Sequence, residues 1–247
     1  LTVGGATFTE MAIMQEIYET PVKSELIAQR ISEIKAAGAV VCGSLTPQSV
    51  QQHYEVAVEA GLDILVIQGT VISAEHVSTT VEPLNLKEFI SEVPIPTVVG
   101  GCASYSTGLH LMRTGAVGVL VGVGPGAACT TRGVLGIGVP QATAIADVAA
   151  ARSQHMLETG EYVNVIGDGG MRTGGDISKA IACGADAVMI GSPLARAKEA
   201  PGRGYHWGMA TFHSSLPRGT RVTTVQDGTM EEILLGPAHT NDGTFNL

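Results

Sequence analysis

The sequence predicts an α/β protein built on a parallel sheet, and three observations support this fold class. The chain has 247 residues, 45% of them hydrophobic and 15% charged, which suits one domain with a large core. Short apolar runs alternate with helical patterns along most of the chain. The runs are continuously apolar, which is typical of strands that helices cover on both faces. Single α/β barrels commonly have about 250 residues.

Six apolar runs are expected to form the strands. In chain order they are Ala39–Leu45, Ile64–Gln68, Thr97–Ala103, Gly118–Gly122, Tyr162–Gly167 and Ala187–Gly191. The helical patterns between them are Gln48–Ala60, Ser106–Thr114, Thr143–Glu158 and Asp176–Cys183. Ahead of the first run, residues 10–37 are mostly helical in pattern and residues 1–5 are strand-like. A closed eight-stranded barrel needs two strands more than these six.

The charge of the chain limits the partners that it can have. The formal net charge is -9 and no basic stripe appears, which argues against a nucleic-acid partner. A phosphorylated ligand is compatible with this charge, because backbone amides at helix N-termini hold phosphate without net positive charge. No apolar run approaches the roughly 20 residues of a membrane span, so we expect no membrane partner.

The four cysteines form no CxxC pair. Cys42, Cys102 and Cys183 lie in apolar patterns, where we expect them to pack as small hydrophobic residues. This usage fits a reduced, cytoplasmic compartment.

The fourth cysteine, Cys129, lies in a glycine-rich segment, VGVGPGAACTTRGVLGIGVPQ, between an apolar run and a helical pattern. Glycine there permits positive φ and a close approach of the backbone to a ligand. Polar Thr130, Thr131 and Arg132 follow the cysteine directly. A buried structural thiol is the alternative, but a loop so rich in glycine is unsuited to a core. The pattern favours an accessible nucleophilic thiol.

Two long motifs resemble the IMP dehydrogenase/GMP reductase family. They are GVGPGAACTTRGVLGIGVPQ and, over Val165–Ser192, VIGDGGMRTGGDISKAIACGADAVMIGS; the likeness covers roughly Ser44–Met209. The segments MQEIYETPVK and HWGMAT resemble a branch without the usual regulatory domain. The resemblance implies one catalytic (β/α)8 TIM barrel over residues 1–247. The six runs would be strands three to eight, so the first strands and the C-terminal part are expected to be missing from the chain.

The resemblance implies a catalytic group of Cys129, Thr131 and Glu199. Cys129 would attack C2 of a purine nucleotide and form a covalent adduct. Thr131, with Glu199 in the segment AKEAPG, would handle an ammonia leaving group. The alternatives are a turn or capping hydroxyl for Thr131 and a solvated carboxylate for Glu199, and we favour a functional role for the pair.

The resemblance also implies substrate contacts. Asp168, followed by Gly169 and Gly170, would bind the ribose hydroxyls at the end of a strand, and a helix cap is the alternative. Gly191 and Ser192, with Pro193, predict the start of a short helix that would bind the phosphate; capping and binding are compatible. The segment resembling the one whose main chain reads the purine edge comprises Gly208, Met209 and Ala210.

Other positions bear on cofactor and ion. Gln68 stands where IMP dehydrogenases have an Asp near the nicotinamide ribose, so it is a candidate cofactor contact. Carbonyls that hold a monovalent cation, potassium, in many members match those of Gly124, Gly126 and Cys129. Ala127 replaces a phosphate-binding serine of many members. His206, where the family often has Tyr, is interpreted as local packing.

The absence of an Arg-Tyr dipeptide favours one of the family's two reactions. IMP dehydrogenases use such a pair to activate water, whereas reductive deamination needs only Thr131 and Glu199. We therefore predict a GMP reductase that uses NADPH to convert GMP to IMP. IMP dehydrogenase with NAD is the first alternative, and a barrel that binds purine nucleotides without turnover is the second. The resemblance implies a homo-tetramer or octamer.

Overall fold

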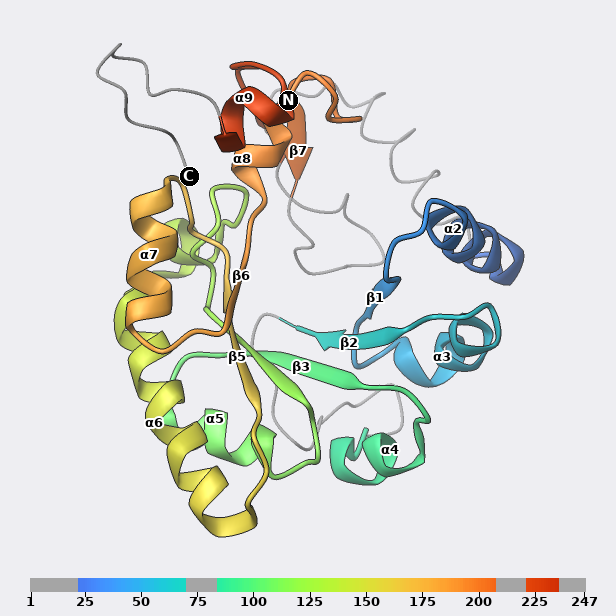
Figure 1. The fold of residues 1–247 in the computed structure, drawn as a ribbon, viewed down its shortest axis with the longest axis vertical. Helices are drawn as coiled ribbons and strands as arrows, with labels where there is room; N and C mark the ends of the chain where they lie inside the picture. The colour runs from blue at the N-terminus through green and yellow to red at the C-terminus, as the bar shows by residue number, and fades with distance from the viewer. Residues whose placement is uncertain (1–21, 70–83, 208–220, 236–247) are drawn as a thin grey trace.

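The computed structural model describes residues 22–69, 84–207 and 221–235 (Figure 1). Its centre is a six-stranded sheet in which all neighbours are parallel and the strands follow in chain order. The strands are β1 (Cys42–Leu45), β2 (Ile64–Gln68), β3 (Thr97–Cys102), β4 (Gly118–Val121), β5 (Asn164–Asp168) and β6 (Ala187–Met189). Each overlaps one predicted apolar run, so the predicted parallel α/β arrangement is confirmed.

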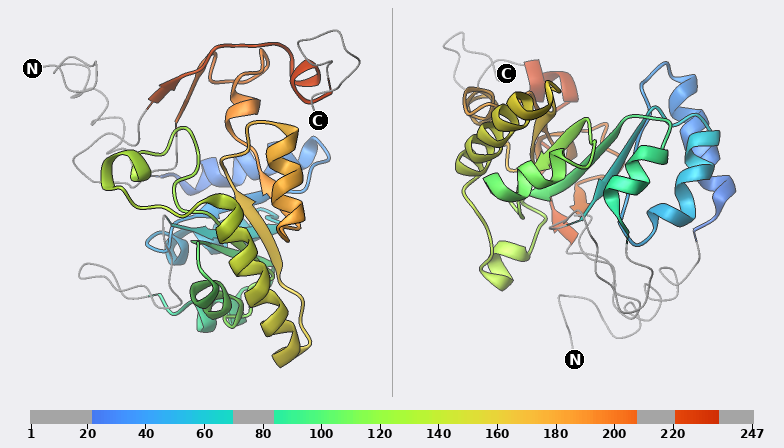
Figure 2. Two further views of the ribbon diagram at one scale, coloured as in Figure 1. Left: turned by 90° about the vertical axis from the view of Figure 1, so that its left-hand side faces the viewer. Right: turned by 90° about the horizontal axis from the view of Figure 1, so that it is seen from below.

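Helices connect these strands and cover the outer side of the curled sheet (Figures 1 and 2). The connecting helices are α3 (Val50–Glu59), α4 (Leu86–Glu92), α5 (Tyr105–Met112), α6 (Gln141–Thr159) and α7 (Gly174–Ala182). α2 (Ser24–Ala36) precedes β1, and the short α8 (Ser192–Ala195) follows β6. A large core lies between the two layers. It joins strand residues such as Ile67, Val119 and Val165 to helix residues such as Leu111 and Ile145.

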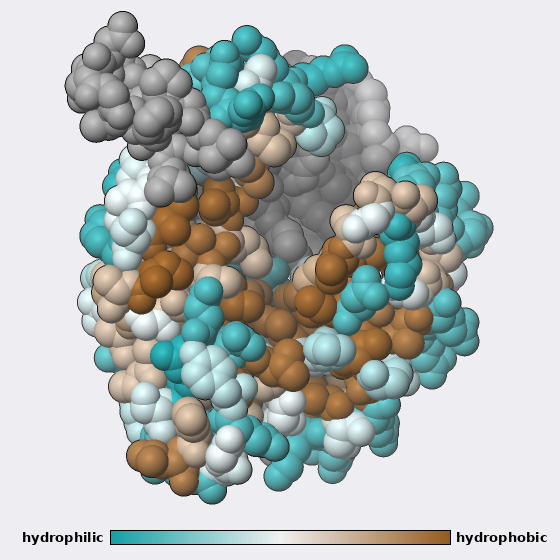
Figure 3. All heavy atoms as spheres, viewed as in Figure 1, coloured by the Kyte–Doolittle hydropathy of each residue, from teal (hydrophilic) through white to brown (hydrophobic). Residues whose placement is uncertain are grey.

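The inner side of the sheet carries a separate, smaller cluster. Val66, Val98 and Leu120 are buried there, and Ile64 and Ile166 pack against them. In the view of Figure 3, hydrophobic residues run across the middle of the molecule, over the strands. The described strands thus form a curled half-barrel, consistent with part of a TIM barrel. The strand-like residues 1–5 lie outside the described residues, so closure by eight strands stays a prediction.

A second unit follows β6 at the end of the molecule where Figure 1 labels α8, β7 and α9. β7 (Tyr205–Trp207) pairs antiparallel with β8 (Arg221–Thr223), and α9 (Met230–Leu235) follows. Backbone hydrogen bonds join this segment to the chain after α8. Lys198 N donates to Gly228 O at 2.8 Å, and Asp227 N donates to Arg196 O at 3.1 Å. The Arg196 and Asp227 side chains also pair at 3.1 Å.

Local sequence sets the ends of the helix that leaves the cysteine loop. α6 begins directly after Pro140, whose fixed φ suits a helix start. It ends at Gly160, which adopts φ 78 in the left-handed region that glycine favours. α6 is therefore longer at its start than predicted, and Gln141 in its first turn donates to Val121 O at 2.6 Å. None of the helices in the described part of the chain has the length and apolar character that a bilayer span requires.

Candidate active site

The candidate site lies at the carboxyl ends of the strands. Gln68 is the last residue of β2 and Asp168 the last of β5. The Cys129 loop leaves β4, and Ser192 begins α8 just after β6. Because all six strands are parallel, these ends meet at one edge of the sheet, where α/β barrels carry their sites.

The loop after β4 needs glycine at defined positions. Gly122 has φ 147 and Gly124 has φ 62, conformations that other residues rarely adopt. A Cβ on Gly124 would lie 3.2 Å from Cys129 Sγ and 3.1 Å from Thr131 Cβ. The chain therefore folds back on itself closely at Gly124, and the cysteine sulfur lies against the bare backbone.

Cys129 and Thr131, two of the three residues of the predicted catalytic group, are in contact. The Cys129 thiol donates to Thr131 Oγ1 at 3.2 Å, and the Cys129 N–H donates to Gly126 O at 3.1 Å. The cysteine is half-buried, and Thr131 begins a π-helix, η1 (Thr131–Leu135). This local turn aligns the sulfur with a hydroxyl two residues away.

The Arg132 side chain links the beginning and the end of this loop through hydrogen bonds, a role that sequence reasoning missed. Its Nε donates to Val123 O at 2.9 Å, and its Nη2 donates to Val139 O at 2.6 Å. A Cβ on Gly138 would lie 2.7 Å from Arg132 Nε, so glycine makes room for the guanidinium. The signal available in the sequence was an arginine directly after the CTT motif, within a run of glycines.

The other cysteines differ from Cys129 in their surroundings. Cys102 is fully buried on β3, and burial raises the pKa of its thiol to about 12, so it stays protonated. Cys183 is half-buried at the end of α7, as expected of a small packed residue. The expectation is wrong for Cys42, which is exposed because β1 is an edge strand with no described neighbour on one side.

Asp168 and Gln68 meet across the site. Gln68 Nε2 donates to Asp168 Oδ2 at 2.9 Å, although the two residues are 100 positions apart. Burial raises the pKa of the Asp168 carboxyl, and the hydrogen bond from Gln68 opposes that rise. Gly170, at φ 79, approaches the cysteine loop, because a Cβ there would lie 3.1 Å from Pro125 Cβ. The loops after β4 and β5 thus pack on each other.

The Ser192 side chain lies in a short row of hydrogen-bonding groups with His206 and Thr224. Its hydroxyl is 3.4 Å from His206 Nε2, and His206 Nδ1 is 2.6 Å from Thr224 Oγ1. Gly191 caps α8, and Ser192 is its first residue rather than the predicted cap. His206 was interpreted as local packing, and that interpretation missed its contact with the candidate phosphate-binding serine. The signal available in the sequence was that His206 stands where the family often has Tyr.

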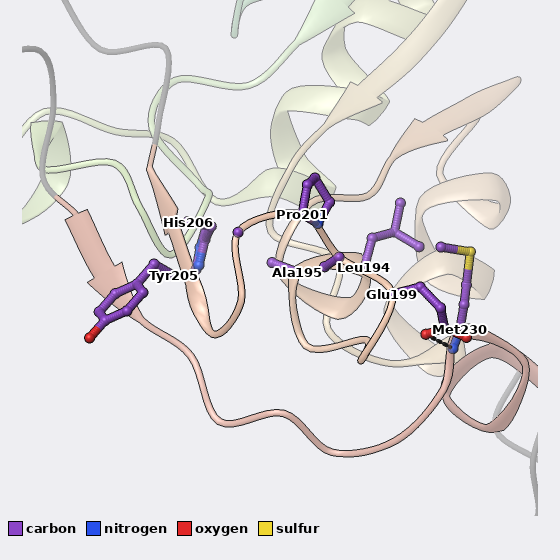
Figure 4. A pocket seen from close by; sticks show the side chains of 9 residues that line it. Leu194, Ala195, Glu199, Pro201, Tyr205, His206 and Met230 are labelled. Carbon is purple, nitrogen blue, oxygen red and sulfur yellow. Dashed lines mark hydrogen bonds between the residues drawn. The ribbon is translucent and has the colours of Figure 1, made fainter.

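Glu199 lies in an open, mostly apolar pocket of about 320 Å³ between α8, β7 and α9. Figure 4 shows its carboxylate turned toward Met230, whose backbone N–H donates to Oε2 at 3.0 Å. Among the described residues, no hydrogen bond joins Glu199 to Cys129 or Thr131. The structure thus brings together two of the three predicted catalytic residues, and the role of Glu199 stays a prediction.

This geometry does not test the predicted contacts with a monovalent cation or with the purine base. The Gly126 carbonyl accepts the Cys129 N–H within the loop. The described residues hold no group of three or more His, Cys, Asp or Glu side chains arranged for a metal. The potassium contacts at Gly124, Gly126 and Cys129 stay predictions. The predicted base-reading segment, residues 208–210, lies outside the described residues.

Fold and site together define a barrel-type α/β protein with a cysteine loop at the carboxyl edge of its parallel strands. Residues 10–226 match the family described as IMP dehydrogenase / GMP reductase domain. The chain belongs to this family, as the sequence motifs predicted.

Several proteins are similar to the chain over most of its length. An uncharacterized oxidoreductase of Mycolicibacterium smegmatis is 48% identical over 239 residues, 95% of this chain and 64% of that protein. An inosine-5'-monophosphate dehydrogenase of Haemophilus influenzae is 37% identical over 78% of this chain and 36% of its own length. A crystal structure of an IMP dehydrogenase/GMP reductase-like protein from Corynebacterium glutamicum superposes with a TM-score of 0.82 at 46% identity. It covers 95% of this chain, which spans 62% of that one. The chain thus spans less than two thirds of the length of each.

Proposed function

We propose that this protein is an oxidoreductase of the GMP reductase type, in which GMP, NADPH and a proton give IMP, ammonia and NADP⁺. The observation that carries the proposal is the contact between the Cys129 thiol and the Thr131 hydroxyl at 3.2 Å. A pure binding protein has no need for a thiol paired with a hydroxyl on a glycine loop.

Cys129 is the nucleophile in the first half of the reaction. Its sulfur bonds to C2 of the purine, and the bond from C2 to the amino nitrogen breaks. The thiol proton joins the two amino hydrogens, so the leaving group is ammonia. Thr131 Oγ1, within hydrogen-bond distance of the sulfur, passes this proton on. Glu199 supports the transfer only after its carboxylate leaves the Met230 N–H.

The second half returns the cysteine to its starting state. Reduced nicotinamide, when bound, supplies the hydride that replaces sulfur at C2. Cys129 then leaves as the thiolate and takes up a proton. Glycine at 122 and 124 lets the loop pack tightly against Asp168 and the cysteine, which holds the sulfur in place for this step. A Cβ on Gly122 would lie 2.7 Å from Asp168 O, and one on Gly124 would lie 3.2 Å from Cys129 Sγ.

The remaining residues bind the nucleotide. Asp168 accepts hydrogen bonds from the ribose hydroxyls, and the Gly170 backbone lies beside it. Ser192 and His206 face the phosphate, since their polar atoms lie together at the start of α8. Ala127 offers no hydroxyl, which removes one hydrogen bond to a charged group, worth about 1.5–3 kcal/mol.

IMP dehydrogenase is the second candidate, and a specific observation favours it. Glu199 holds the α9 backbone rather than Thr131, so the deaminating pair is not formed in the structure. A 37% identical relative also carries that name. Against it stands the sequence, in which no Arg is followed by Tyr to activate water.

One pair of assays separates the readings. The protein is mixed with GMP and NADPH, then with IMP and NAD, and the absorbance of reduced nicotinamide is followed. Loss of NADPH with GMP alone supports the proposal, whereas NADH formation with IMP alone overturns it. A 6-chloropurine nucleotide should label Cys129 in either enzyme. Nucleotide binding with neither turnover nor labelling identifies a non-catalytic barrel.

A further inference from the structure

We propose that Gln68 is a positioning residue for Asp168, one that orients the carboxylate toward the ribose diol and thereby makes the site selective for ribonucleotides over 2′-deoxyribonucleotides. This role rests on the proposed purine-nucleotide site. It places Gln68 on the substrate side, whereas the resemblance implied a contact with the cofactor.

Gln68 and Asp168 end two strands, β2 and β5, that are separated in the sheet by β3 and β4. Gln68 on β2 lies opposite Gly100 on β3, which lies opposite Leu120 on β4. A Cβ on Gly100 would lie 2.5 Å from Leu120 Cβ, and one on Gly122 would lie 2.7 Å from Asp168 O. Glycine at both positions lets these chain segments pack closely, and across β3 and β4 the Gln68 amide donates to Asp168 Oδ2 at 2.9 Å.

A third residue fixes which way the amide faces. The Ser44 hydroxyl on β1 donates to Gln68 Oε1 at 3.4 Å. Because Oε1 accepts from Ser44, the Nε2 hydrogens point toward Asp168. Within the described residues, Oδ2 of Asp168 accepts from Gln68 and Oδ1 accepts no hydrogen bond. One carboxylate oxygen is therefore anchored, and the other is free for a ligand hydroxyl.

The chemistry of an amide at position 68 suits this task. A diol is bound most strongly by an ionised carboxylate, since hydrogen bonds to a charged acceptor are stronger than neutral ones. Burial raises the pKa of Asp168, and donation from Gln68 favours the ionised form. A carboxylate at position 68 would instead bring two like charges together. Gln68 thus orients Asp168 and opposes the rise in its pKa that burial causes.

Binding measurements on the whole chain test this role. Calorimetric dissociation constants for GMP and 2′-deoxy-GMP are compared in the wild type, Gln68→Leu and Gln68→Glu. We expect Gln68→Leu to weaken GMP binding about tenfold and 2′-deoxy-GMP binding less than about twofold, because only the diol uses the oriented carboxylate. Gln68→Glu should weaken GMP binding further. Gln52→Leu, which alters an exposed amide on α3, is the matched control and should change neither constant.

The outcomes separate this role from the proposed function. An equal loss for both nucleotides in Gln68→Leu, or an unchanged ratio, shows a merely structural glutamine and overturns the inference. If that variant does not fold, Ser44→Ala takes its place, with a smaller shift of the same ratio expected; no shift overturns the role. If the wild type binds neither nucleotide, the purine-nucleotide function itself fails, and this role with it.

Discussion

The loops after β4 and β6 leave the same edge of the sheet, yet they hold their candidate catalytic residues in different ways. Cys129 and Thr131 are two residues apart and in contact at 3.2 Å. Glu199 contacts Met230, 31 positions along the chain. Local backbone geometry is enough to pair the first two. The third depends on where a separate segment docks.

The hydrogen bonds that hold each region in place explain this difference. Arg132 closes the first loop through carbonyls at 123 and 139, both within nine residues of it. In the second region, α9 is fixed by its own capping box. Thr229 N donates to Glu232 Oε2 at 2.8 Å, and Glu232 N donates to Thr229 Oγ1 at 3.1 Å. Glu199 adds a hydrogen bond to this helix start, so its described contact is with α9.

Removing the sulfur should have the largest effect, because the first loop carries the covalent step. Cys129→Ala is expected to lower GMP-dependent NADPH oxidation at least about a thousandfold, as loss of a nucleophile does. It should also abolish labelling by a 6-chloropurine nucleotide. Cys183→Ala, at the end of α7, is the matched control and should retain both properties. Retained turnover in Cys129→Ala would refute the covalent route.

Glu199→Gln tests whether the second region contributes to chemistry at all. The amide still fills the site but cannot carry a proton, so kcat should fall about a hundredfold, within the range for general acid–base groups. Labelling by the chloropurine nucleotide should proceed normally, because chloride leaves without a proton. An unchanged kcat would assign Glu199 to the capping of α9 alone.

Arg132→Ala should loosen the first loop without removing any reacting group. Two hydrogen bonds from a guanidinium are lost, each worth about 1.5–3 kcal/mol, so the loop samples open states. We expect the rate of Cys129 labelling to fall about tenfold, within the few kcal/mol that these bonds supply. Arg30→Ala, on exposed α2, is the control. A normal rate in Arg132→Ala would show that glycine geometry alone positions the sulfur.

The same contrast explains what the sequence could predict. The six strands were predictable because each is a short, continuous apolar run between helical patterns. Cys129 and Thr131 were predictable as a pair because they share one turn. The contact of Gln68 with Asp168 was not, since it joins the ends of two strands that are 100 residues apart and have β3 and β4 between them in the sheet. The contact of Glu199 with α9 could not be predicted either, because no local sequence pattern shows where residues 224–235 pack in the fold.

Removing the hydrogen bond between Glu199 and α9 is expected to give the smallest change in kcat, and it compares the two regions most directly. Met230 is the first residue of α9, the position where proline is tolerated in helices. Met230→Pro removes the N–H that Glu199 accepts while leaving the helix able to form. If Glu199 must leave α9 to act, kcat should rise about threefold to tenfold, since a hydrogen bond that competes with the working position is gone.

Met230→Ala keeps the N–H and should leave kcat unchanged. Met230→Pro in the Glu199→Gln background should give no rise, because the gain depends on the carboxylate. A fall in kcat for Met230→Pro alone would show instead that Glu199 works from its place on α9, and that the two regions act as one site.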